Sequence, residues 1–320
     1  MTRLHDVYPA DRVVLREVGL RDGLQLVKSF PSTAAKIEWI NSEYAAGVRN
    51  FEIGSFLPAS RFPQFADVRE VLAAVKALPG AHAVGLVLND RGADDALAAG
   101  VDEIMCVVSA TEAHSQANTR RSRAEAIAHV KRLCALRDAS DHRPLVNAGI
   151  AMAFGCSISG AVDPDEVLSL AEALFEAGAD IVGLADTVGF AGPDQVAALI
   201  KRTRAIAGDR AAAIHLHDTR GMAMANASAA LDAGCRILDG SLGGLGGCPF
   251  APGATGNAVF EDLVFLCETK GFATGIDLGK LIGIREILKR EMPSETLYGQ
   301  LARAGLPHAT GAGAAGAGTI

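Results

Sequence analysis

Two histidines separated by a single residue, in the segment His215-Leu216-His217-Asp218, follow a short apolar run at 211–214. In an extended strand alternate side chains share a face, so both imidazoles lie on one side of the strand, roughly 7 Å apart. Neutral imidazole is a suitable ligand for Zn, Mn, Fe, Ni and Cu alike. The pair therefore predicts a metal site at the end of a strand.

Asp22, which follows an apolar segment at 13–18, is the best candidate for an oxygen ligand beside the histidines. Two histidines and one carboxylate with open coordination positions are typical of a catalytic site rather than a closed structural one. The neighbouring Arg21 carries a permanent, fork-shaped charge that suits an oxyanion. Glu17 and Glu52 lie within apolar segments, where an unpaired carboxylate is costly, so we expect them to orient the metal ligands or the arginine.

A glycine-rich segment, Gly243-Gly-Leu-Gly-Gly247-Cys248-Pro, is the second informative stretch. Its glycines permit the backbone freedom that a closing lid requires. A cysteine at the end of such a lid could donate or accept a proton, so Cys248 is a candidate catalytic residue. Asn257, a short way further on, could supply another oxygen ligand.

Short apolar runs rich in β-branched residues alternate with longer Ala-, Leu- and Glu-rich patterns along the chain. Repeated strand-then-helix units predict a parallel sheet. Several helical patterns end in Ala-Gly, as at Ala46-Gly47 and Ala99-Gly100, which is a signal for a helix end. The expected strands are Val13–Val18, Asn50–Gly54, Ala83–Leu88, Glu103–Val108, Leu145–Ala151, Ile181–Ala185, Ala212–Leu216 and Arg236–Gly240. The expected helices include Ser32–Ala46, Val68–Ala77, Ser122–Ala139, Pro164–Ala177, Pro193–Ala207 and Gly221–Ala233.

Eight such units favour a closed (β/α)₈ barrel over an open doubly wound sheet, and no G-x-G-x-x-G motif follows the first strand. Chemistry in this barrel gathers at the carboxyl ends of the strands, which is where the polar residues above occur. We expect one barrel domain over residues 1–308 and a short, flexible, low-complexity tail over 309–320.

Composition narrows the class of partner. A net charge of −7 over 320 residues argues against a nucleic-acid or anionic membrane surface. The six cysteines are scattered without a C-x-x-C pair, which fits a reducing cytoplasm. No signal-peptide pattern and no long apolar stretch suggest secretion or a membrane span.

Taken together, the motifs resemble those of the 3-hydroxy-3-methylglutaryl-CoA lyase family, from about Val13 to about Val264. Arg-Asp-Gly-x-Gln and His-x-His-Asp also occur in a wider superfamily of metal-dependent Claisen-type barrels, whereas the glycine-rich loop is specific to the lyases. The matching stretches are Arg21-Asp22-Gly-Leu-Gln25, Glu52 with Ser55-Phe56, Asp186-Thr187-Val-Gly189, His215-Leu-His217-Asp218 and the loop to Cys248-Pro.

The resemblance implies cleavage of 3-hydroxy-3-methylglutaryl-CoA into acetyl-CoA and acetoacetate with a divalent cation, Mg²⁺ or Mn²⁺. Arg21 would stabilise the thioester enolate, Glu52 would assist, Cys248 would transfer a proton, and the base would be Asp22 or a water on the metal. The implied metal ligands are Asp22, His215, His217 and Asn257. The implied acyl-CoA contacts are Arg21, Gln25, Lys28 and Asp186. A homodimer is an expectation from the family only.

Three loops depart from the family pattern, at 57–64, 111–118 and 153–157. Because the resemblance places these loops around the acyl and CoA pocket, a second hypothesis is the same chemistry on another 3-hydroxy-3-alkyl acyl-CoA. A third is a condensing synthase of the isopropylmalate or citramalate type, which the Cys248 loop and the lack of a regulatory domain disfavour. A fourth is a non-catalytic barrel that serves as an interaction module.

Overall fold

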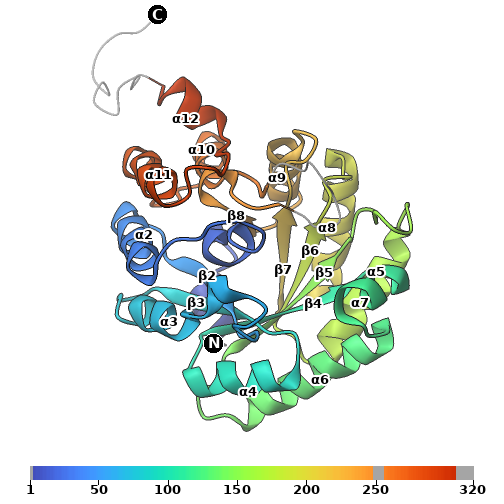
Figure 1. Ribbon diagram of the computed structural model, residues 1–320. Helices are drawn as coiled ribbons and strands as arrows, with labels where there is room; N and C mark the ends of the chain where they lie inside the picture. The colour runs from blue at the N-terminus through green and yellow to red at the C-terminus, as the bar shows by residue number, and fades with distance from the viewer. Residues whose placement is uncertain (1–2, 248–255, 308–320) are drawn as a thin grey trace, which may run out of the picture.

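The computed structural model describes residues 3–247 and 256–307, so the expected tail at 309–320 lies outside the described residues. Eight parallel strands close into a barrel in chain order, and β1 pairs with both β2 and β8. Figure 1 shows the strands at the centre with helices around them. The predicted (β/α)₈ barrel is confirmed.

The strands lie within two residues of the expected bounds at either end, because β-rich apolar runs between helix ends define them well. They are β1 Val14–Glu17, β2 Asn50–Ser55, β3 His82–Leu86, β4 Glu103–Ser109, β5 Leu145–Ala151, β6 Ile181–Asp186, β7 Ala211–Leu216 and β8 Ile237–Gly240.

The helices that cover the barrel begin at the expected polar caps, such as Ser32 and Ser122, and two end at Gly47 and Gly100 in the left-handed region. Their bounds are α1 Arg3–Val7, α2 Thr33–Ala46, α3 Val68–Lys76, α4 Asp90–Ala99, α5 Glu112–Thr119, α6 Arg123–Ala139, α7 Pro164–Glu176, α8 Pro193–Ala207, α9 Ala223–Asp232, α10 Phe260–Thr269, α11 Leu278–Glu291 and α12 Gln300–Ala304.

The amino-terminal end of the barrel is closed by an apolar plug. Leu4 of α1 and the following Tyr8 pack against the first inward-facing residues of the strands. Those residues are Leu145, Ile181, Ala213 and Ile237. A ligand therefore has to enter at the opposite, carboxyl end of the strands, where chemistry gathers in this fold.

Helices α10 and α11 follow the barrel proper and were not among the expected helices. Helix α11 packs against α2, and Figure 1 shows α10, α11 and α12 gathered on the side of the barrel near β8. Within the ranges described above, no helix is long and apolar enough to cross a membrane.

Candidate active site

A tight turn after β1 places Arg21 and Asp22 at the mouth of the barrel. Residues Gly19–Gly23 form a single π-helical turn, in which the backbone N–H groups of residues 21, 22 and 23 all converge on the carbonyl oxygen of Val18. The Glu17 carboxylate fixes the turn from behind, accepting hydrogen bonds from the N–H of Gly19 at 2.6 Å and of Leu242 at 3.0 Å. Glu17 thus holds the backbone that carries Arg21 and Asp22, and contacts neither side chain.

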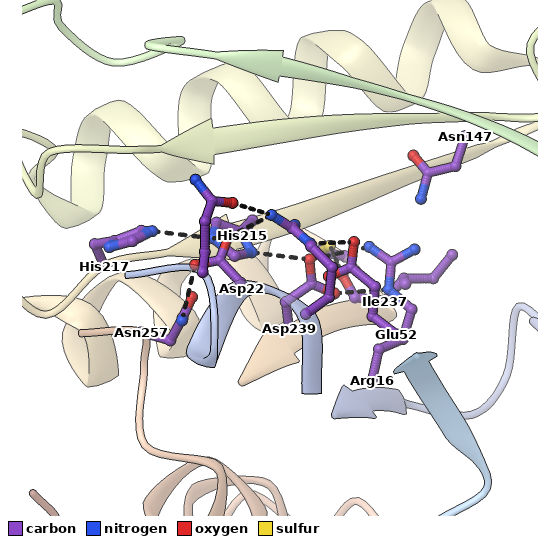
Figure 2. A network of polar contacts seen from close by, with 12 residues as sticks. Arg16, Asp22, Glu52, Asn147, His215, His217, Ile237, Asp239 and Asn257 are labelled. Carbon is purple, nitrogen blue, oxygen red and sulfur yellow. Dashed lines mark hydrogen bonds and ion pairs between the residues drawn. The ribbon is translucent and has the colours of Figure 1, made fainter. Parts of the chain in front are cut away.

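The carboxylate and the two histidines come together as predicted. Ligand atoms of Asp22, His215 and His217 all lie within 4.8 Å of one another. The two imidazole Nε2 atoms face each other at 3.1 Å, and His215 Nε2 lies 3.8 Å from Asp22 Oδ2. Two facing nitrogens beside a carboxylate oxygen are a set of ligand atoms that can bind a divalent cation (Figure 2).

Asn257 completes the same cluster. Its segment runs alongside the end of β7, where the Ala258 N–H donates to the Leu216 carbonyl at 2.8 Å. The Asn257 amide nitrogen donates to Leu245 O at 3.0 Å and to Asp22 Oδ1 at 3.2 Å. Its Oδ1 is buried and accepts no hydrogen bond from any described residue. Because buried polar atoms are rarely left without a partner, this oxygen fits a fourth cation ligand.

The charge states of Asp22 and His217 also suit a cation. Burial opposes ionisation of Asp22, but Arg21 and the two histidines outweigh it and lower the pKa of that carboxyl well below its usual range. Burial, together with the nearby His215, lowers the pKa of His217 to about 4. An ionised carboxylate and a neutral imidazole are the protonation states that metal binding requires.

Arg21 is held rigidly beside the cluster. Its Nε donates to Glu52 Oε1 at 2.7 Å, and its Nη1 lies 3.0 Å from Asp22 Oδ2 and donates to Gln25 Oε1 at 3.2 Å. Burial alone would lower the pKa of Arg21, yet Glu52 and Asp22 raise it above its ordinary value. The pocket therefore contains a fixed positive charge next to the cation site. Arg21, Asp22, Gln25 and both histidines all line this pocket.

Behind the histidines lies a layer of buried charges that sequence reasoning missed. His215 Nδ1 contacts Asp239 Oδ2 at 3.1 Å, and Arg16 donates to both Asp239 oxygens, at 2.6 and 3.1 Å. Arg16 also donates to Glu103 Oε1 at 3.0 Å, which Asn147 Nδ2 contacts at 2.9 Å. Figure 2 shows this chain of contacts running from His215 into the barrel. The available signal was a charged residue at an inward position of β1, β4 and β8.

Replacing Asp239 by Asn is expected to weaken Mn²⁺ binding by about 10- to 100-fold, because a carboxylate behind a ligating histidine fixes its tautomer and raises its basicity. Isothermal titration of the metal-stripped protein measures this affinity. The matched control is Asp232→Asn, which removes an exposed carboxylate paired with Lys270 on the surface. Equal affinities for both variants would show that Asp239 does not tune the site.

The side chains of two further sequence candidates, Asp186 and Lys28, are not part of the cluster. Asp186 is buried, and its oxygens accept hydrogen bonds from the N–H groups of Phe190 and Ala191, so it caps the loop after β6 while the next residue, Thr187, lines the pocket. Lys28 is exposed, and its backbone N–H donates to Glu295. Cys248 lies outside the described residues, although Gly247 lines the pocket.

The Glu17 carboxyl makes stability depend on pH. Burial raises its pKa from 4.5 to about 8, so the folded protein holds a proton there that the unfolded chain has lost above pH 4.5. Its contribution to stability is therefore complete below pH 4.5 and is lost as pH rises towards 8. Glu17→Gln should flatten this decline, measured by urea unfolding between pH 5 and pH 8; an unchanged slope would contradict the assignment.

Fold and site together define a (β/α)₈-barrel enzyme with a cation site of two histidines and one carboxylate at the carboxyl end of its strands. The chain belongs to the HMGL-like family, whose model matches residues 12–288. The curated relatives of this chain include acyl-CoA lyases, and the resemblance stated from the motifs is confirmed.

Three relatives illustrate the similarity. Hydroxymethylglutaryl-CoA lyase of Bacillus subtilis is 37% identical over 294 residues, which cover 91% of this chain and 97% of the relative. (R)-citramalyl-CoA lyase of Chloroflexus aurantiacus is 38% identical over 304 residues, 91% of this chain and 95% of the relative. The solved structure of an HMG-CoA lyase from Acinetobacter baumannii with coenzyme A and 3-methylmalate is 36% identical, with a TM-score of 0.84 over 95% of this chain and 97% of that one.

Proposed function

We propose that this protein cleaves 3-hydroxy-3-methylglutaryl-CoA into acetyl-CoA and acetoacetate with the help of Mg²⁺ or Mn²⁺. The observation that carries the proposal is a single pocket that contains both a cation site and the fixed charge of Arg21. The hydroxymethylglutaryl-CoA lyase relatives, and the related structure in complex with coenzyme A and 3-methylmalate, support this substrate class.

The cation would be held by Asp22, His215, His217 and Asn257, and when bound it supplies Lewis acidity that lowers the pKa of the substrate's tertiary hydroxyl. Asp22, which is ionised in the pocket, or a water molecule beside it would take up the hydroxyl proton. As the C2–C3 bond breaks, negative charge develops on the thioester oxygen. Arg21 is a preorganised donor for that charge, and Glu52 and Gln25 keep its guanidinium in place.

The last step is protonation of the enolate carbon, which we assign to Cys248 from the sequence alone. Lys28 and Asp186 remain proposed contacts or supports of the substrate on the same basis. Cys248→Ser tests the proton-transfer assignment, since a hydroxyl at that position is a much weaker acid than a thiol. Turnover equal to that of the unmodified protein would remove Cys248 from this role.

A second candidate substrate is citramalyl-CoA, favoured by the 38% identity to the Chloroflexus lyase. The same bond cleavage on this shorter acyl group would release acetyl-CoA and pyruvate. Each ester, incubated with the protein and Mn²⁺, should be assayed for acetyl-CoA together with its specific co-product, acetoacetate or pyruvate. Free CoA formed from acetyl-CoA and pyruvate would instead indicate a condensing synthase.

We also propose that the protein works in the cytoplasm as a homodimer. The five described cysteines are all free and buried, which suits a reducing compartment. The proposal of a dimer rests on the family resemblance. Light scattering of the purified protein tests it. A monomeric mass at micromolar concentration would contradict it.

A further inference from the structure

The pocket that contains the cation site continues into the barrel, and on one side its wall has almost no side chains. Among the residues of β5, β6 and β7 that line the pocket from above Asn147 up to the level of His215, all except Ile214 and His215 itself are glycine or alanine. These wall residues are Gly149, Ala151, Gly183, Ala185 and Ala213. The interior of a (β/α)₈ barrel is ordinarily filled by bulky branched side chains, so this wall leaves space that the fold does not require.

Strand register shows where that space lies. Gly183 pairs with Gly149 on one side and Ala213 on the other, so three adjacent strands carry minimal side chains at one level. The next inward pair along the same strands is Ala185 with His215, which carries the cation site. The level of Gly149, Gly183 and Ala213 therefore lies deeper in the barrel than the cation site, by one pair of inward-facing residues. It does not lie at the outer mouth, where the CoA portion would enter.

The opposite wall is apolar, and we call the space between the two walls the chamber. Met105 and Val107 of β4 face it, as do Leu86 and Leu88 from the end of β3 and the residues after it. The whole pocket, chamber included, has a volume of about 150 Å³. An apolar cavity of roughly that size holds a six-carbon ring in other proteins, so the chamber, which is only part of this pocket, holds a smaller apolar group.

The charges around the chamber do not favour a second anion. Among the described lining residues the arginines are Arg16 and Arg21, and each is already paired with two carboxylates. Asn147 lies at the inner end of the chamber, and its amide nitrogen donates a hydrogen bond to Glu103. A carboxylate in the chamber would find no free cation, whereas an alkyl group would leave water and contact Leu, Met and Val side chains.

Building on the retro-Claisen function proposed above, we infer that the preferred substrates are 3-hydroxyacyl-CoA esters with an apolar C3 substituent larger than methyl, seated in the chamber. With the hydroxyl and the carboxylate-bearing arm at the cation site and the thioester arm directed to the mouth, the alkyl substituent is the fourth group on C3 and is left to point inwards. Each added methylene that the chamber buries should raise kcat/KM about fourfold, until the chain reaches Asn147.

The test compares C3-methyl, C3-propyl and C3-pentyl esters of 3-hydroxyglutaryl-CoA by acetyl-CoA release with Mn²⁺. A Cβ at Gly183 would meet its nearest neighbours at 3.6 and 3.7 Å, which is ordinary contact, so Gly183→Ala and Gly183→Val add bulk to the chamber stepwise. Gly283→Val is the matched control, because a Cβ at this exposed position of α11 meets nothing within 4 Å. Thermal melting shows whether each variant is folded, and Gly183→Ala serves if Gly183→Val is not.

We expect the unmodified protein and Gly283→Val to prefer the propyl or pentyl ester over the methyl ester by about tenfold or more, from fourfold per methylene. Gly183→Val should reverse that ratio, and Gly183→Ala should reduce it. Preference for the methyl ester by the unmodified protein, or an equal loss on all esters in Gly183→Val, would overturn the chamber inference alone. No acetyl-CoA from any ester would instead overturn the proposed function on which it rests.

Discussion

His217→Ala is expected to reduce both Mn²⁺ affinity and acetyl-CoA release by more than about 100-fold, a larger loss than for a residue behind a ligand. His217 is buried, its pKa of about 4 keeps it neutral, and its side chain contacts His215 across the cation site. The substitution therefore removes a ligand without breaking an ion pair that supports the fold. Electron paramagnetic resonance of Mn²⁺ and steady-state kinetics measure the two losses.

The control for this variant is His142→Ala, which removes an exposed histidine that bonds the Val101 carbonyl far from the pocket. It should bind Mn²⁺ as the unmodified protein does. Retention of tight Mn²⁺ binding by His217→Ala would mean that the cation, if any, is bound elsewhere.

Arg21→Gln is expected to lower kcat by about 100- to 1,000-fold, the usual effect of removing one preorganised donor from a developing oxyanion. Arg21→Lys should recover only part of this, since lysine retains the charge but cannot span Glu52, Asp22 and Gln25 as the guanidinium fork does. Measuring kcat at saturating substrate and Mn²⁺ separates this effect from weaker binding.

Arg202→Gln removes an exposed arginine paired with Asp165 and should leave kcat unchanged. Because Arg21 contacts the cation-site carboxylate, Mn²⁺ affinity must be measured in the same Arg21 variants. A loss of turnover that disappears at saturating Mn²⁺ would assign Arg21 to metal binding and contradict its role at the oxyanion.

The fold and the centre of the site were predictable because both depend on short-range patterns. The strand-helix alternation fixes a barrel order in which β1 and β7 are separated only by β8, and that order brings Asp22 to the two histidines. His215 lies among the last residues of β7, His217 directly follows that strand, and Asp22 lies in the turn after β1. Glu52 was likewise expected to orient Arg21, and the two form an ion pair at 2.7 Å.

The parts that the sequence left unpredicted depend on register between strands. Arg16 meets Asp239 because β1 and β8 pair at those two residues, and it reaches Glu103 across the barrel interior. No local pattern marks such a contact. The glycine and alanine wall is similar, since Gly149, Gly183 and Ala213 look unremarkable until the strand pairing places them side by side.

The most direct test of the proposed function is acetyl-CoA release from 3-hydroxy-3-methylglutaryl-CoA and its 3-alkyl analogues by protein stripped of metal and then titrated with Mn²⁺. We predict negligible release in the chelator and release that rises with Mn²⁺ to saturation, with one co-product molecule per acetyl-CoA. Equal release in the chelator, or none from any ester at saturating Mn²⁺, would contradict a cation-dependent carbon–carbon lyase.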